Sequence, residues 1–262
     1  QRKTPAKRAP RKTAVTTAKT AARPGTRKKT SRTAKPKGLE AQYSGKIFRS
    51  RLEARWAILM DLLDINWDYE PSHYQVGPAL WYLPDFYLPE HQLWLEVKGP
   101  VFMDAQSMAK CIGSIAGPMP LPLREAPYTA ADRLLIGGPL RLRQGMTARH
   151  TLVTKDGSGK AALSYASVSR GGIRALGQPW DRVEANGVAK ARRPLPDRLQ
   201  VLVDPDPAFG VQDSEAERAY RIAAGAVFDD ASKTLSGTTD PSIIRELARR
   251  RGGRPLGPFP AS

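Results

Sequence analysis

The chain has 262 residues, enough for one large domain or two small ones, and it carries a formal net charge of +17 at pH 7. Forty-two Lys and Arg residues against 25 Asp and Glu residues indicate a polyanionic partner. The single cysteine, Cys111, excludes a disulfide framework and a structural zinc site, and no apolar run approaches the roughly 20 residues of a membrane-spanning helix, so we expect no membrane partner.

Most of the excess charge lies in residues 1–38, which hold 14 basic residues and no acidic residue and leave 28 basic against 25 acidic residues elsewhere. Four prolines interrupt any helix there, and Val15 is the one large apolar side chain, so burial cannot offset the entropy of ordering. We expect a disordered tail over residues 1–42 that binds phosphates by releasing counterions. A solubilising tail and an organelle transit peptide are the alternatives. Because the chain begins at Gln1, we expect the native tail to begin earlier.

Ten basic residues are candidates for contacts with a nucleic-acid backbone, eight in the tail and two near the other end of the chain. They are Lys7, Arg8, Arg11, Lys12, Arg27, Lys28, Lys29, Arg32, Arg250 and Arg251. The two C-terminal arginines have a structural alternative, because cations also stabilise the C-terminus of a helix.

A helix with one buried face is predicted over about residues 46–64. Its apolar residues recur at steps of three and four, at Phe48, Leu52, Trp56, Leu59 and Leu63. The alternation that follows in residues 66–70 predicts a short strand that stops at a proline.

A β-hairpin is predicted next, from two aromatic-rich runs joined by residues 89–92. Because side chains alternate across a strand, Glu96 and Lys98 share one face, and the residues between and before them point to the core. Pairing through the turn brings Asp85 of the partner strand close to Glu96. Two close carboxylates repel each other, which favours a divalent cation between them, and oxygen ligands favour Mg²⁺ or Mn²⁺ over zinc.

The arrangement of these residues resembles the PD-(D/E)xK nuclease superfamily. Pro84-Asp85 is followed, after ten intervening residues, by Glu96-Val97-Lys98, and Glu53 lies on the preceding helix. The resemblance implies a restriction-endonuclease-like α/β core, with a mixed central sheet flanked by helices. The resemblance covers about residues 43–138. Within this range, residues 48–56, 82–86 and 94–99 are similar to small nuclease-like proteins of phages and actinobacteria.

The resemblance also implies a role for each residue of the motif. Asp85, Glu96, Glu53 and the carbonyl of Val97 would bind Mg²⁺ or Mn²⁺, and Lys98 would orient the attacking water and neutralise charge on the phosphate. Glu53, Asp85, Glu96 and Lys98 would then be the catalytic residues of a Mg²⁺-dependent deoxyribonuclease, most simply an endonuclease. Each has a structural alternative: an exposed ion pair for Glu96 and Lys98, a turn for Asp85, and a solvated helix position beside Arg49 for Glu53.

The remaining elements are predicted from shorter patterns. Residues 103–116 indicate a crossover helix, and residues 132–138 a buried strand. A hairpin turns at 156–159, a capping box opens a helix over 214–229, and Asp240 caps a last helix that ends at Gly252. We therefore divide the chain into a basic tail (1–42), a nuclease-like core (43–140) and an extension with a hairpin, two helices and an Arg-rich end (141–262).

The function expected from the sequence is a metal-dependent nuclease that hydrolyses DNA and is tethered to it by the basic tail, with RNA as the alternative substrate. A non-catalytic DNA-binding protein of the nucleoid or virion, built on a nuclease scaffold, is one alternative. A structure-specific resolvase or repair endonuclease is another, and it would favour a homodimer. The expected location is the cytoplasm, associated with the nucleoid, or a virion if a phage encodes the protein.

Overall fold

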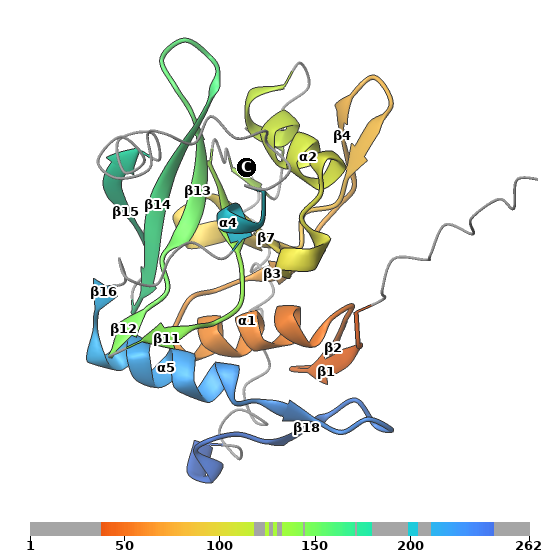
Figure 1. Ribbon diagram of the computed structural model, residues 1–262. Helices are drawn as coiled ribbons and strands as arrows, with labels where there is room; N and C mark the ends of the chain where they lie inside the picture. The colour runs from red at the N-terminus through yellow and green to blue at the C-terminus, as the bar shows by residue number, and fades with distance from the viewer. Residues whose placement is uncertain are drawn as a thin grey trace, which may run out of the picture. The chain divides into compact units, whose positions relative to one another are not determined.

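The computed structural model describes residues 38–117, 124–125, 128–129, 133–143, 145–170, 172–179, 199–203 and 211–243. These residues all fall within one compact unit, whose centre is a seven-stranded sheet (Figure 1). In spatial order the strands are β15 (Gly172–Pro179), β14 (Ala161–Ser169), β13 (His150–Lys155), β10 (Arg133–Gly137), β7 (Leu93–Val97), β6 (Phe86–Leu88) and β3 (Asp68–Tyr69).

The sheet is mixed, with one parallel pair. β7 and β10 run parallel, with Glu96 beside Ile136, whereas every other neighbouring pair is antiparallel. Parallel neighbours need a long crossover, and helix α2 (Ala105–Ala116) lies in the connection between them, capped by Asp104. This confirms the crossover helix and the buried strand predicted from the sequence.

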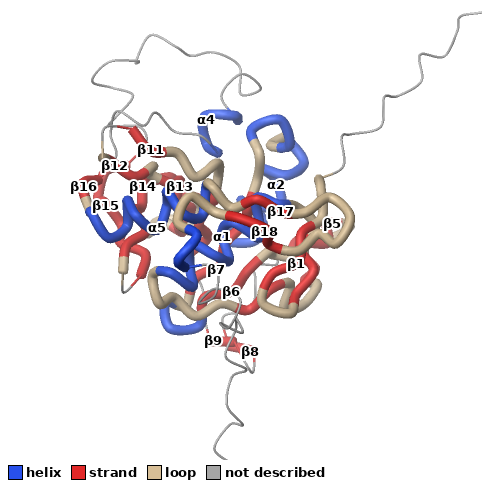
Figure 2. Tube along the Cα trace, turned by 90° about the horizontal axis from the view of Figure 1, so that it is seen from below, coloured by secondary structure: helices blue, strands red, loops and turns tan. Residues whose placement is uncertain are grey.

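Helices cover both faces of the sheet, and the alternation of β7 shows how. Leu93, Leu95 and Val97 join the apolar cluster that contains the buried residues of α1 (Arg51–Leu62) and α5 (Ser214–Ala224). Trp94 points the other way, into the cluster with α2 and α4 (Leu199–Val203). Figures 1 and 2 both show α5 beside α1. The predicted mixed sheet with flanking helices is therefore confirmed.

Helix α1 starts later than predicted. Residues 46–48 instead form β2 (Lys46–Phe48), which pairs with β1 (Ala41–Tyr43) through a tight turn with positive φ at Ser44 and Gly45. Phe48 is buried as predicted, but it packs from a strand, so its helical spacing is coincidental. The helix begins after Ser50, whose hydroxyl accepts the N–H of Glu53.

The predicted hairpin that carries the acidic residues is confirmed, with one change at its start. β6 and β7 pair across a 3-10 turn over Pro89–His91, and the next residue, Gln92, has a positive φ. Residues 80–82 are not part of this hairpin. They form β5 (Leu80–Tyr82), which pairs with β4 (Tyr74–Gly77) in a separate two-stranded sheet.

The C-terminal elements are partly as predicted. The β13–β14 hairpin turns at Asp156 as predicted. Helix α5 is capped by Asp213 and ends at Ala224 rather than at 229. The helix ends earlier because the residues after it form β17 (Val227–Phe228), which pairs with β18 (Leu235–Gly237). Asp240 is followed by a 3-10 turn over Pro241–Ile243, and the rest of the predicted last helix lies outside the described residues. Two small sheets complete the fold. One has three strands, β11 (Leu142–Arg143), β12 (Met146–Thr147) and β16 (Val211–Gln212), and the other pairs β8 (Arg124–Glu125) with β9 (Tyr128–Thr129).

No helix in the described part of the chain is both long enough and apolar enough to span a bilayer.

Candidate functional site

Asp85 and Glu96 are brought together by the β6–β7 hairpin. Phe86 pairs with Leu95, so one step further along the ladder Asp85 faces Glu96. The backbone N–H of Val97 donates to Asp85 Oδ2 at 2.7 Å, which fixes the Asp85 carboxylate against the end of β7. Both carboxylates are buried, with 7% of Asp85 and 4% of Glu96 exposed. The exposed alternative for Glu96 therefore does not hold, whereas Asp85 lies in a bend just before β6, so its turn alternative is not excluded.

Glu96 is held by two neighbours. The buried Tyr82 hydroxyl donates to Glu96 Oε2 at 2.7 Å, and Lys98 Nζ lies 2.7 Å from Glu96 Oε1. Lys98 is itself fixed, because its backbone N–H donates to the carbonyl of Gly137 on β10 at 2.8 Å. About a quarter of the Lys98 side chain is exposed, so the ammonium group connects the buried carboxylates to solvent.

Glu53 enters the site from the first turn of α1. Its carboxylate accepts three hydrogen bonds: from the Ser50 hydroxyl (2.7 Å), the Tyr69 hydroxyl (2.7 Å) and the backbone N–H of Arg49 (3.1 Å). In return the Ser50 hydroxyl accepts the N–H of Glu53, so these bonds cap the N-terminus of α1 and also fix the carboxylate. Glu53 is buried rather than solvated, and it meets the backbone of Arg49 and not its guanidinium group.

The charges of these side chains act on one another. Burial raises the pKa of Asp85 well above its ordinary value, and the negative charges of Glu96 and Glu53 raise it further, while Lys98 opposes the shift. Burial also raises the pKa of Glu53, against its hydrogen bonds from Tyr69 and Ser50. Burial alone would lower the pKa of Lys98, but Glu96 and Asp85 raise it, so the ammonium group stays charged. Three acids against one ammonium leave the site short of positive charge.

The chemistry of the donors fits a hard divalent cation. Carboxylate oxygens from Asp85, Glu96 and Glu53, with the carbonyl of Val97 at the end of β7, are the ligands that Mg²⁺ and Mn²⁺ prefer. The raised pKa of Asp85 supports this fit, because a cation would relieve the repulsion that causes part of it. Across the described residues, no group of three or more His, Cys, Asp and Glu side chains is arranged to hold a metal ion. In the present arrangement, Glu96 Oε1 and Oε2 are taken by Lys98 and Tyr82.

Two tyrosines at the site were not predicted from the sequence. Tyr82 and Tyr69 each donate to one acid, and both come from strands beside the hairpin. The alternation of residues 80–82 offered a weak signal for Tyr82, but the acid that it meets depends on the packing of β5. Cys111 is fully buried on α2, and its pKa is raised by burial first and then by the nearby charge of Glu96.

The basic residues predicted to contact nucleic acid lie outside the described part of the chain. Those in residues 1–37 and those at 250–251 therefore remain predictions.

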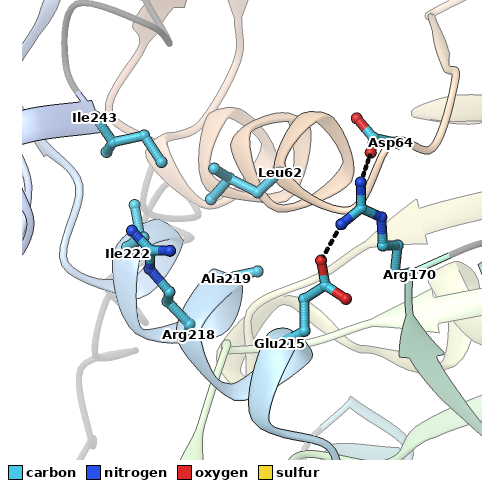
Figure 3. Close-up of a pocket in the computed structure, with 8 residues that line it drawn as sticks. All are labelled: Leu62, Asp64, Arg170, Glu215, Arg218, Ala219, Ile222 and Ile243. Carbon is cyan, nitrogen blue, oxygen red and sulfur yellow. Dashed lines mark hydrogen bonds and ion pairs between the residues drawn. The ribbon is translucent and has the colours of Figure 1, made fainter.

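A cavity of about 210 Å³ lies elsewhere, between the end of α1 and the outer face of α5 (Figure 3). Its apolar lining consists of Leu62, Ala219, Ile222 and Ile243. Arg170 also lines it and pairs with Asp64 and Glu215. None of the four predicted catalytic residues lines it.

No model of a known protein family matches the sequence, and no curated protein or solved structure matches it significantly.

Proposed function

We propose that this protein is a metal-dependent nuclease of the PD-(D/E)xK type that hydrolyses phosphodiester bonds in DNA. The observation that carries the proposal is the buried pair of facing carboxylates, Asp85 and Glu96, with the Lys98 ammonium group 2.7 Å from one of them. A binding module gains nothing from two repelling carboxylates beside a phosphate backbone, whereas metal-assisted phosphodiester hydrolysis uses acids to hold the metal and a cation to neutralise charge on the phosphate.

The proposal gives each residue the role that the resemblance implies. Asp85, Glu96, Glu53 and the Val97 carbonyl would hold Mg²⁺ or Mn²⁺, which supplies a water of lowered pKa and charge for the phosphate. Lys98 extends from the carboxylates towards solvent, where it can orient the attacking water and neutralise charge that develops on the phosphate oxygens. Tyr82 and the N-terminal turn of α1 keep the acids Glu96 and Glu53 in fixed positions.

The basic tail supports DNA as the partner, because a segment with 14 cations and no acid binds any phosphate backbone. Such a tether raises the local concentration of the catalytic site at DNA without selecting a sequence. We propose that the protein is associated with the nucleoid, or with a virion if a phage encodes it, and RNA is the alternative substrate.

The test compares the wild-type protein with Asp85→Ala and Lys98→Ala on linear, circular, single-stranded and branched DNA and on RNA. Each reaction contains Mg²⁺, Mn²⁺ or EDTA. Lys155→Ala and Asp230→Ala serve as controls, because both positions are exposed. We expect cleavage that depends on the metal and that is lost in the two site variants but kept in the controls.

The substrate that is cut fastest distinguishes the nuclease roles. Preference for branched DNA, together with a dimer in solution, would indicate a resolvase or repair enzyme. Binding of every substrate without cleavage under either metal would refute the nuclease proposal, and the non-catalytic DNA-binding protein would take its place.

A further inference from the structure

Arg49 lies at the rim of the acidic site, immediately before α1. Its backbone N–H is 3.1 Å from Glu53 Oε2 and 3.1 Å from the Tyr69 hydroxyl, so the residue is anchored to one acid of the site. Its side chain, in contrast, is 63% exposed. A rigidly anchored backbone that carries an exposed guanidinium group is suited to contact a ligand that approaches the site from solvent.

Glu70 connects Arg49 to the second acid. The backbone N–H of Glu70 donates to the carbonyl of Asp85 at 2.9 Å, and Glu70 Oε1 lies 2.7 Å from Arg49 Nε. Glu70 also has a φ of +47°, a conformation that is costly for a residue with a side chain and that clusters at functional sites. Arg49 and Glu70 are thus paired with each other, and their backbone N–H groups contact the Glu53 carboxylate and the Asp85 carbonyl, respectively.

The Arg49–Glu70 ion pair is made at Nε of the guanidinium group, which lies 2.7 Å from Glu70 Oε1. Because 63% of the side chain is exposed, solvent reaches the guanidinium group. Two terminal nitrogens in one plane match two oxygens of a phosphate, which a lysine cannot do with a single ammonium group.

We propose that Arg49 binds a backbone phosphate of the nucleic acid next to the phosphate that is cut, with Glu70 holding the guanidinium group at the rim. The inference rests on the nuclease activity proposed above, and it adds a residue that positions the strand. Because Arg49 would contact a phosphate that does not react, its loss should weaken substrate binding more than it slows the chemical step.

The test combines a protein variant with a neutral phosphate in the substrate. After the cut has been mapped, single methylphosphonates replace the linkages on either side of it, one at a time, and KM and kcat are measured for the wild-type protein, Arg49→Ala and Arg49→Lys. Arg221→Ala is the matched control, because Arg221 is 61% exposed and paired with Glu217 on α5. Arg49→Ala keeps the backbone N–H that anchors this turn, so its fold should be preserved.

For the wild-type protein we expect a methylphosphonate at one position to raise KM about tenfold, because one charge-assisted contact is lost there. Arg49→Ala should raise KM by a similar factor on the unmodified strand and then show no further penalty at that position. Arg49→Lys should recover part of the loss, Arg221→Ala should match the wild type, and kcat should change less than KM throughout.

The failure of the Arg49 assignment can be distinguished from the failure of the nuclease proposal. If the wild-type protein cuts DNA but Arg49→Ala shows the same KM, or the same methylphosphonate penalties, the assignment of Arg49 is wrong and the nuclease proposal stands. If the wild-type protein cuts no nucleic acid at all, the nuclease proposal fails and the role of Arg49 fails with it.

Discussion

Replacing Asp85 by asparagine should stabilise the protein while it abolishes cleavage. The Asp85 carboxylate is buried and faces Glu96, and burial and that charge together raise its pKa well above the ordinary value. The amide of asparagine keeps an oxygen for the N–H of Val97 but removes the buried negative charge. Replacing a buried, only partly compensated charge by a neutral group of similar shape gains about 1–2 kcal/mol, or about 2–8 °C in Tm for a domain of this size.

Asp61 provides the matched control, because it is an aspartate of similar burial with the opposite environment. Its carboxylate accepts the Tyr43 hydroxyl at 2.7 Å and the indole N–H of Trp67 at 2.8 Å. Asn at this position offers one oxygen for two donors, so Asp61→Asn should cost about 1–3 kcal/mol. The two substitutions are chemically identical, so opposite signs can come only from their surroundings.

The stability gained by Asp85→Asn depends on pH. A carboxyl group whose pKa is raised in the folded state adds stability below its ordinary pKa near 3.8 and loses that contribution as the pH rises through the raised value. The advantage of Asp85→Asn should therefore be larger at pH 8 than at pH 5. Urea unfolding of both variants and the wild type at the two pH values measures it. A variant less stable than the wild type at pH 8, or an advantage that does not change with pH, would refute the reasoning.

Four further predictions address other parts of the molecule. Mg²⁺ or Mn²⁺ at 10 mM (about ten times a millimolar Kd) should raise the Tm of the wild type by about 2–5 °C in a thermal melt and leave that of Asp85→Asn unchanged. Tyr82→Phe removes the donor to Glu96 Oε2, and it should lower kcat about tenfold in the cleavage assay with a stability loss of about 1 kcal/mol; an unchanged kcat would contradict this role. Gly138→Ala would place its Cβ 1.6 Å from the carbonyl oxygen of Val203, so it should cost more than about 3 kcal/mol in urea unfolding, whereas Gly157→Ala, with no atom within 4 Å, should be tolerated. Burial lowers the pKa of His150 to about 3, so the folded state should lose stability as the pH falls below 6.5, and an acid titration of His150→Phe should show a shallower loss.

The central hairpin was predictable because it is local. Asp85 and Glu96 are joined by a short turn, and the alternation of a strand decides which side chains share a face, so their juxtaposition follows from residues 85–98 alone. Lys98 follows from the same alternation. The environment of each acid was not predictable, since burial of Glu96 depends on β10 and α2, which come later in the chain.

The start of α1 was predicted wrongly because an apolar residue at helical spacing can come from a strand. Phe48 fits the spacing of the helix, but the turn at Ser44-Gly45 places it in the second strand of a β-hairpin. Two local signals were available: the Ser-Gly turn, and the capping pair Ser50 and Glu53, which marks the first helical turn.

The contacts of Arg49 with Glu70 and of Tyr69 with Glu53 were not predictable from the sequence. Arg49 and Glu70 are far apart in the chain, and their meeting depends on how β3 pairs with β6 beside the end of α1. Tyr69 reaches Glu53 for the same reason. The pattern of charged residues alone would pair Arg49 with Glu53, four residues away on a helix that does not extend to Arg49.

The pairing of β10 with β13 determines how far the chain can be shortened for expression. A fragment that ends near residue 140 would retain Glu53, Asp85, Glu96 and Lys98, but it would leave the outer edge of β10 without its hydrogen-bond partner. An uncovered apolar edge strand recruits strands from other copies, so such a fragment should aggregate. A fragment that continues through β15 would instead carry the whole sheet.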